Sequence, residues 1–284
     1  MSAQKLPIGV QSFQSLRESG YLYVDKTPYI EQLLRGKVYF LSRPRRFGKS
    51  LFLSTLAAYF RGQKELFKGL YLEKAEEELA QQEGREAWQE YTVLYLDLNT
   101  EYYRSEKDLD NILNIHLTAW EELYGKNEIE QTHSSRFKGI IERAYKKEQR
   151  EVVILVDEYD KPLYETLDNE VLNATYRGIL KGVFSVIKSS DEYLRFAFLT
   201  GITKFSKVRV FSGLNNLEDL SMDNEYAGIC GITEQELETY FSAYIRVLAE
   251  KKKLSYDETK KLLKENYDGY CFAAEGEKVD NPFS

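Results

Sequence analysis

The sequence predicts an α/β fold, a parallel sheet of about five strands with helices on both faces. Two stretches carry this prediction. Residues 38–41 form an apolar strand that leads through a basic loop into an amphipathic helix. Residues 152–156 are all aliphatic, the pattern of a strand buried on both faces of a parallel sheet. Helical patterns separate these strands from the other strand patterns, as crossovers between parallel strands require.

The composition describes a globular chain without a dominant charge. Its 284 residues carry a net charge of −7, so neither nucleic acid nor an anionic membrane attracts the chain as a whole. The two cysteines, Cys230 and Cys271, form no disulfide framework and no zinc-ligand spacing, which fits a reducing cytosol. The first residues lack an apolar targeting segment and no later run approaches about 18 apolar residues. We therefore expect a cytoplasmic protein without membrane contact.

The loop after residue 41 carries the first functional motif. It reads Ser42-Arg43-Pro44-Arg45-Arg46-Phe47-Gly48-Lys49-Ser50. From Arg43 onward it matches the phosphate-loop spacing G-x-x-x-x-G-K-[ST], with arginine in place of the first glycine. Backbone N–H groups near Gly48 and the N-terminus of the next helix would point at a phosphate chain. The alternative is a basic surface turn that ends in Gly-Lys-Ser by chance, but the flanking strand and helix favour phosphate binding.

Individual residues of this loop have expected roles. Lys49 would reach the β- and γ-phosphates, and the Ser50 hydroxyl would bind Mg²⁺. Gly48 would let the backbone approach a phosphate without a Cβ clash. An apolar stripe in residues 53–60 supports a helix that ends at Gly62. The residues expected to line the nucleotide are Pro44, Arg45, Arg46, Phe47, Gly48, Lys49, Ser50 and Leu51.

Residues 1–36 are expected to form a lead-in that packs on the core. A short strand in this segment stops at Thr27, and Pro28 occupies the first position of a helix. Asp25 and Lys26 lie just before that helix. For both, a solvated turn is favoured over contact with a nucleotide.

The middle of the chain predicts further helices and one more strand. Residues 91–98 are β-branched and aromatic, the pattern of a strand. The crossover after residue 162 is expected to be interrupted near Asn169. Helices are expected over residues 64–88, 107–124, 135–147 and 162–189.

The strand over residues 152–156 ends in an acidic pair. Ligands of doubly wound sheets bind beyond the carboxyl ends of the strands, so this pair is where a metal–phosphate site would lie. Asp157 would hold Mg²⁺, usually through its water shell. Glu158 would orient or deprotonate an attacking water. The alternative is a strand that ends in a charged turn, but the upstream Gly-Lys-Ser supplies the other half of one site.

A strand over residues 194–200 is expected to lie between the phosphate-loop strand and the acidic strand. Many ATPases place a γ-phosphate sensor at the end of such a strand. Thr200 is the candidate and Thr203 the reserve, and turn capping is the alternative for both. A fifth short strand is expected near residues 217–221. Arg209 would neutralise charge or lie exposed at a strand edge.

Residues 223–284 differ in character from the core over residues 37–222. Two capping boxes, Thr233-Glu234-Gln235-Glu236 and Ser255-Tyr256-Asp257-Glu258, predict helices over residues 234–251 and 256–266. A turn and strand follow over residues 267–272. The pattern indicates a small helical or winged-helix-like module.

Five motifs together resemble those of the AAA-ATPase-like family of bacterial proteins, which are P-loop ATPases often followed by a restriction-endonuclease-like nuclease domain. The motifs are Tyr23-Val24-Asp25-Lys26-Thr27, the loop over residues 43–50, Val156-Asp157-Glu158-Tyr159-Asp160, Phe211-Ser212-Gly213-Leu214-Asn215-Asn216 and Asn281-Pro282-Phe283-Ser284. The arginine in place of the first glycine is similar to this family's own pattern. The resemblance implies an ATPase fold, and it implies that more chain follows Ser284, so we expect a fragment or a natural truncation.

The leading functional expectation is ATP binding and Mg²⁺-dependent hydrolysis that drives a conformational change. The lack of a guanine-reading N-K-x-D motif favours ATP. One alternative is a nucleotide-binding switch with weak hydrolysis, and the other is the ATPase part of a nuclease machine without its nuclease domain. Glu158 favours hydrolysis, because a pure binder needs no water-activating carboxylate there. The expected partners are the nucleotide and an unidentified protein client, with nucleic acid only through a C-terminal domain beyond Ser284.

Overall fold

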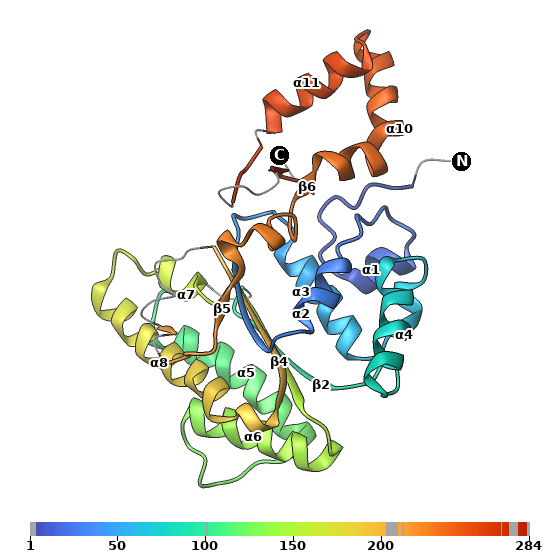
Figure 1. Ribbon diagram of the computed structural model, residues 1–284. Helices are drawn as coiled ribbons and strands as arrows, with labels where there is room; N and C mark the ends of the chain where they lie inside the picture. The colour runs from blue at the N-terminus through green and yellow to red at the C-terminus, as the bar shows by residue number, and fades with distance from the viewer. Residues whose placement is uncertain are drawn as a thin grey trace.

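Five parallel strands form the central sheet in the order β2-β3-β4-β1-β5 (Figure 1). Their bounds are Val38–Ser42 (β1), Thr92–Asp97 (β2), Val152–Asp157 (β3), Leu194–Gly201 (β4) and Glu218–Asp219 (β5). The computed structural model describes residues 4–99, 102–202, 210–211, 213–267, 269–272 and 278–282. The predicted α/β fold with about five parallel strands is confirmed.

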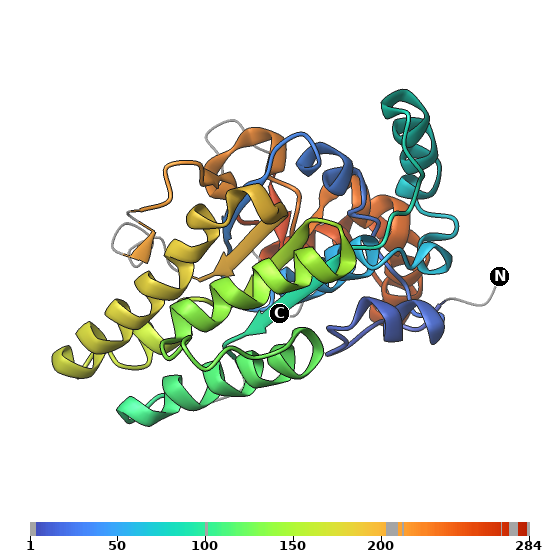
Figure 2. The same cartoon turned by 90° about the horizontal axis from the view of Figure 1, so that it is seen from below.

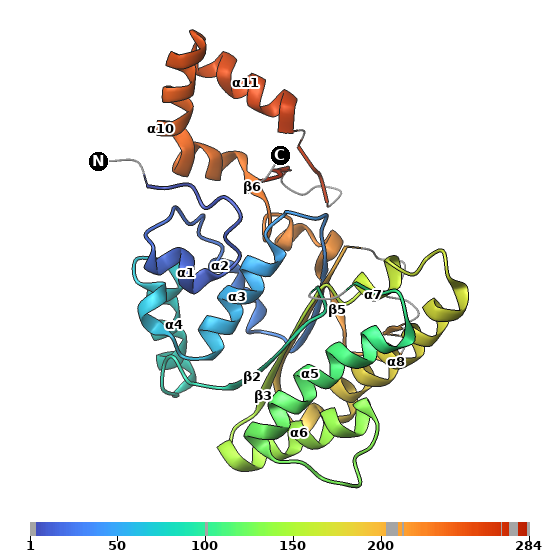
Figure 3. The same ribbon diagram turned by 180° about the vertical axis from the view of Figure 1, so that it is seen from behind.

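Both faces of the sheet are buried under helices. On β1, Val38 and Phe40 belong to one buried apolar cluster, while Tyr39 and Leu41 belong to the other, because successive side chains of a strand alternate between faces. Helices α5, α6 and α8 cover the first face, and α1 to α4 cover the second (Figures 1 and 3). Figure 2 shows α5, α6 and α8 side by side, in green to yellow.

The helices of this body have the following bounds. They are Phe13–Glu18 (α1), Pro28–Leu33 (α2), Lys49–Phe60 (α3), Tyr71–Glu83 (α4), Glu106–Tyr124 (α5), His133–Glu148 (α6), Lys161–Tyr164 (α7) and Glu170–Ser189 (α8). Short 3₁₀ turns span Lys64–Phe67, Asp191–Tyr193, Leu220–Met222 and Asn224–Tyr226.

Two local signals fix where helices begin and end. At the end of α3, Gly62 has a left-handed backbone (φ 66°), and the following residue, Gln63, donates from its N–H to the carbonyl of Ala58 at 3.1 Å. This is the Schellman arrangement, which glycine favours. At the start of α8, the Asn169 side chain accepts from the N–H of Leu172 at 3.1 Å. The crossover after residue 160 is therefore two helices, α7 and α8, as the interruption near Asn169 predicted.

The strand order confirms that β4 lies between the phosphate-loop strand β1 and the acidic strand β3. In register, Leu41 of β1 pairs with Thr200 of β4, and Val156 of β3 pairs with Leu199 of the same strand. The ends of the three strands therefore meet at one edge of the sheet. The fifth strand is shorter than expected, because only Glu218 and Asp219 pair with β1.

The C-terminal module projects from the body (Figure 1) and consists of α10 (Glu234–Lys252), α11 (Tyr256–Tyr267) and an antiparallel pair, β6 (Ile232–Thr233) with β7 (Val279–Asp280). Both predicted capping boxes form. The Thr233 side chain accepts from the N–H of Glu236 at 3.1 Å, and the Ser255 side chain accepts from that of Glu258 at 3.2 Å. The strand expected near residue 270 is only a bridge between Tyr270 and Val279.

The lead-in is joined to this module by a largely buried ion pair, so the expectation of a solvated turn at Lys26 is wrong. The Nζ of Lys26 donates to the Glu236 carboxylate at 2.6 Å and to the Gly228 carbonyl at 2.7 Å. Asp25 also has structural partners, since its carboxylate accepts from the N–H groups of Thr27 and Tyr71. The pairing was not predictable locally because Lys26 and Glu236 are 210 residues apart.

We expect Lys26→Met to lower the free energy of unfolding by about 1–3 kcal/mol, because it leaves a carboxylate and a carbonyl without their buried donor. Urea denaturation of the two proteins measures the difference. Lys64→Met is the matched control, since its partner Glu77 and Lys64 itself are about half exposed. Equal unfolding midpoints for Lys26→Met and the parent chain would contradict the role of this pair.

Candidate functional site

The candidate site lies at the carboxyl ends of β1, β4 and β3. A loop over residues 43–48 joins β1 to α3, and Gly48 directly precedes Lys49, the first residue of that helix. Gly48 has a left-handed backbone (φ 92°), which glycine adopts without a steric cost. The loop therefore ends at a helix start whose first N–H groups have no partner within the helix, as anion binding requires.

Lys49 is the central cation of this edge. It is 4% exposed, and its Nζ donates to the carbonyls of Arg43 and Pro44, each at 3.0 Å. Burial lowers the pKa of the Lys49 ammonium, and the nearby carboxylates, of which Glu158 and Asp157 act most strongly, oppose that shift. The side chain thus contacts the loop directly and lies within the electrostatic range of the acidic strand end.

The other loop side chains point in different directions. The exposed Arg45 donates from Nη2 to the Tyr164 hydroxyl at 2.5 Å, and its guanidinium lies 4.9 Å from the centroid of that ring. Arg46 is exposed and has a left-handed backbone (φ 67°). Phe47 is buried, and its carbonyl accepts from the N–H of Gly231 at 3.0 Å. The remaining residues expected to line the nucleotide are half-buried: Pro44, Gly48, Ser50 and Leu51.

Arg43, which stands where the usual motif has its first glycine, points into the protein. Its Nη1 donates to the Ser221 carbonyl at 2.9 Å, and its Nη2 donates to the Tyr226 carbonyl at 3.1 Å. Its guanidinium lies 4.2 Å from the centroid of the Phe272 ring. Burial lowers the pKa of this guanidinium. Arg43 therefore ties the loop to the segments that follow the sheet.

Asp157 is held by a hydroxyl group of the neighbouring strand β4. The Thr200 hydroxyl donates to Oδ1 of Asp157 at 2.6 Å. Thr200 is 0% exposed, and its oxygen also accepts from the N–H of Glu158 at 3.4 Å. On β2, burial and the charges of Asp157 and Asp97 raise the pKa of the Tyr95 phenol, which therefore keeps its proton. The contact with Thr200 orients the carboxylate at the end of β3.

Glu158 follows at a turn in the chain. It has a left-handed backbone (φ 50°), a conformation that is uncommon outside glycine and concentrates at functional sites. Burial, followed by the charge of Asp157, raises the pKa of Glu158, while Lys49, Lys161 and Arg45 oppose the shift. A half-buried carboxylate with a raised pKa is suited to accept a proton from water.

Position 201 requires a glycine, because the end of β4 lies very close to the residues that follow β3. A Cβ there would lie 2.4 Å from the Tyr159 ring and 2.8 Å from Oδ1 of Asp160. Asp160 is fully buried, and its carboxylate accepts from the N–H of Ile202 at 3.0 and 3.2 Å. Gly201 therefore allows the segments after β3 and β4 to pack together.

The donor atoms at this edge suit Mg²⁺ in combination with phosphate. Mg²⁺ prefers oxygen ligands and is usually held by one or two protein groups together with phosphate oxygens and water. Asp157 supplies a carboxylate held by the Thr200 hydroxyl, and Ser50 supplies a hydroxyl in the first turn of α3. Within the described ranges, His, Cys, Asp and Glu form no cluster of three that would hold a metal without phosphate.

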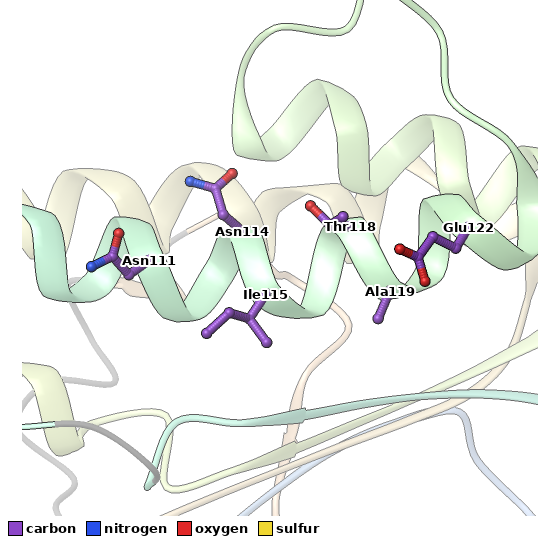
Figure 4. A pocket seen from close by; sticks show the side chains of 6 residues that line it. All are labelled: Asn111, Asn114, Ile115, Thr118, Ala119 and Glu122. Carbon is purple, nitrogen blue, oxygen red and sulfur yellow. The ribbon is translucent and has the colours of Figure 1, made fainter.

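A separate hollow runs along α5 and contains none of these residues. Figure 4 shows that its lining side chains project from a single helix. They are Asn111, Asn114, Ile115, Thr118, Ala119 and Glu122. A surface lined by one helix offers few converging polar groups, so it is a weaker candidate than the sheet edge.

Residues 7–211 match the family model described as "Predicted AAA-ATPase". The chain belongs to the AAA-ATPase-like family. The match covers the loop, the acidic strand end and the whole parallel sheet up to β4, which confirms the resemblance drawn from the motifs.

A longer relative is similar over the whole chain. It is a protein of Azotobacter chroococcum mcd 1 described as "Uncharacterized protein in vnfD 5'region", and it is 41% identical over 286 residues. The match covers 100% of this chain and 51% of the relative, so the chain spans about half the relative's length. In the part of the chain that the structure describes, no helix combines the length and apolar character of a membrane span.

Three residues that lie near Asp157 and Glu158 were assigned no role in the site from the sequence. They are Tyr95, Asp97 and Asp160. Asp97 ends β2 and pairs in register with Asp157, and burial raises its pKa. The available signal was the position of Asp97 at the end of a parallel strand, the same signal that identified Asp157. Thr203, the reserve sensor, and Arg209, expected to neutralise charge or to lie exposed at a strand edge, lie outside the described residues.

We expect Arg43→Gly, which restores the usual motif, to lower the free energy of unfolding by about 2–4 kcal/mol. The reason is that three carbonyls, those of Ser42, Ser221 and Tyr226, lose a charged donor and the Phe272 ring loses its cation. Urea denaturation gives the value. Arg46→Gly is the matched control in the same loop, because Arg46 is exposed and glycine suits its positive φ. An unchanged stability of Arg43→Gly would show that the arginine does not anchor the loop.

Proposed function

We propose that this chain binds a nucleoside triphosphate, ATP in keeping with its family, and hydrolyses it with Mg²⁺. One observation carries the proposal: the buried ammonium of Lys49 donates to two phosphate-loop carbonyls at the start of α3 and feels the charges of Glu158 and Asp157 at the end of β3. A cation at a helix N-terminus that faces the field of an acidic pair suits the γ-phosphate end of a triphosphate.

Positively charged, oxygen-bearing and basic side chains would bind phosphate, hold Mg²⁺ and accept a proton, respectively. Lys49 would leave the carbonyls of Arg43 and Pro44 and donate to the β- and γ-phosphates. Ser50 and Asp157 would hold Mg²⁺, which when bound neutralises charge on the phosphate oxygens. Glu158 would accept a proton from water as that water attacks phosphorus and the bond to the bridging oxygen breaks. ADP and inorganic phosphate would leave.

One further side chain would position Asp157. The Thr200 hydroxyl donates to its carboxylate from the neighbouring strand β4, which restricts the orientation of the carboxylate. A hydroxyl that donates its proton to Asp157 cannot at the same time donate a hydrogen bond to a γ-phosphate. We therefore propose Thr200 as a positioning residue, in place of the sensor role expected from its place at the end of β4.

The contacts of the loop support coupling between nucleotide and conformation. Lys49 is bonded to the carbonyl of Arg43, and Arg43 is bonded to the carbonyls of Ser221 and Tyr226. When Lys49 turns to phosphate, one bond in this chain of contacts is lost. The segments that lead to the C-terminal module would then respond to the nucleotide.

A second candidate is a nucleotide-dependent switch with slow hydrolysis. Its support is the engagement of the Thr200 hydroxyl with Asp157, which leaves one fewer donor for the transition state. The turnover of Glu158→Gln separates the two functions, because only fast hydrolysis requires Glu158 as a base.

We expect Lys49→Ala to weaken nucleotide binding and turnover together, whereas Glu158→Gln keeps binding and loses about 10²–10⁴-fold in turnover. Lys49 contacts phosphate in the ground state and the transition state alike, and glutamine keeps the shape of Glu158 without its basicity. Calorimetric affinity and steady-state hydrolysis of ATP, with GTP for comparison, measure both properties. EDTA should abolish turnover in the parent chain.

Lys64→Ala is the control, because this exposed lysine lies in the 3₁₀ turn that follows α3 and pairs with Glu77. Parental turnover in Glu158→Gln would favour the switch. Parental affinity in Lys49→Ala would overturn phosphate binding at this loop.

The raised pKa of Glu158 predicts a pH dependence. The residue accepts a proton only as a carboxylate, so turnover should fall as the pH drops through a pKa that lies above the ordinary value of 4.5. The pH profile of kcat measures this acidic limb. The slow residual turnover of Glu158→Gln should lack the limb, and the same limb in both proteins would exclude Glu158 as the base.

A further inference from the structure

The sheet order gives the bound nucleotide a direction. The γ-phosphate end belongs on the side of β1 where β4 and β3 bring Asp157 and Glu158. The base of an extended nucleotide would then lie at the other end of the loop, away from β3. On the far side of β1 come β5 and the segments that follow it, and the last described residues of the chain lie above the loop between β1 and α3 (Figures 1 and 3).

That side of the loop carries a cluster of three aromatic rings. The Phe47 ring, one residue before Gly48, lies edge-on to Tyr270 at 4.9 Å and to Phe272 at 5.4 Å between centroids. Tyr270 and Phe272 are nearly parallel, with 12° between their planes. Phe47 is 1% exposed, whereas Tyr270 is 41% exposed. The cluster therefore has a buried base and an exposed ring beside the phosphate loop.

Backbone hydrogen bonds hold the segment that carries this exposed ring, and a cation contacts the ring beside it. Tyr270 exchanges two backbone hydrogen bonds with Val279, at 2.7 and 2.9 Å. Arg43 lies 4.2 Å from the centroid of Phe272, the ring parallel to Tyr270. A ring that is already ordered loses little conformational freedom when a ligand stacks on it.

From this arrangement we propose that the base of the nucleotide stacks on Tyr270. The inference rests on the proposed function, because the loop must first hold the phosphates. Stacking needs only a flat π-face, so the contact accepts any base and favours the larger rings of purines over pyrimidines. Tyr270 thus links recognition of a purine nucleoside triphosphate to the C-terminal segment.

The test compares a nucleotide with a ligand that has phosphates and no base. Calorimetry of the 284-residue chain with Mg²⁺ would use the non-hydrolysable ATP analogue AMP-PNP and inorganic tripolyphosphate. Tyr270→Ala should weaken AMP-PNP about 5- to 100-fold and leave tripolyphosphate unchanged. Tyr270→Phe keeps the ring and should bind both ligands as the parent does. Tyr71→Ala is the control, because this half-exposed tyrosine lies on α4.

Each outcome has a distinct meaning. Parental AMP-PNP affinity in Tyr270→Ala, with tripolyphosphate still bound, would overturn the stacking role and leave the proposed function standing. Equal losses for both ligands would show that the ring supports the loop rather than the base, which also overturns the inference. A parent chain that binds neither ligand would overturn the proposed function and this inference with it.

Discussion

The candidate site depends on how the protein compensates one buried positive charge, the ammonium group of Lys49. An ammonium group removed from water is costly unless carbonyls or carboxylates replace its hydration, and Lys49 is nearly fully buried. Its compensation comes from two sources, the loop carbonyls of Arg43 and Pro44 and the acids that follow β3. In this sheet only β4 separates β3 from β1, so the acids at the end of β3 act on the Lys49 charge. The strand order and the charge of Lys49 are thus parts of one constraint.

The strands of the sheet were predictable because their signals are local or periodic. Residues 152–156 are apolar at every position, which only a strand covered on both faces tolerates. The break at Asn169 was equally readable, since a side chain that accepts from an N–H three residues later begins a helix wherever it occurs. Asp157 and Lys49 were identified as neighbours for the same reason, because parallel strands end at one edge.

The contacts that were not predictable join segments distant in sequence. Arg43 was recognised as a departure from the usual motif, but its partners Ser221 and Tyr226 are 178 and 183 residues away. Tyr95 and Asp97 were counted only as parts of a strand, because nothing in their own segment indicates that β2 lies beside β3. Thr200 was expected to face phosphate. Which way its hydroxyl points depends on Asp157 across the sheet, and no sequence pattern encodes that choice.

The ion pair between the lead-in and the C-terminal module also bears on the order of folding during synthesis. Lys26 is made early, and its partner is made 210 residues later. At about 5–20 residues per second, that separation corresponds to roughly 10–40 s of translation. During this interval the sheet strands can already pair, while the lysine stays hydrated. The lead-in reaches its final environment only after α10 has left the ribosome, so the first segment to be synthesised is among the last to be completed.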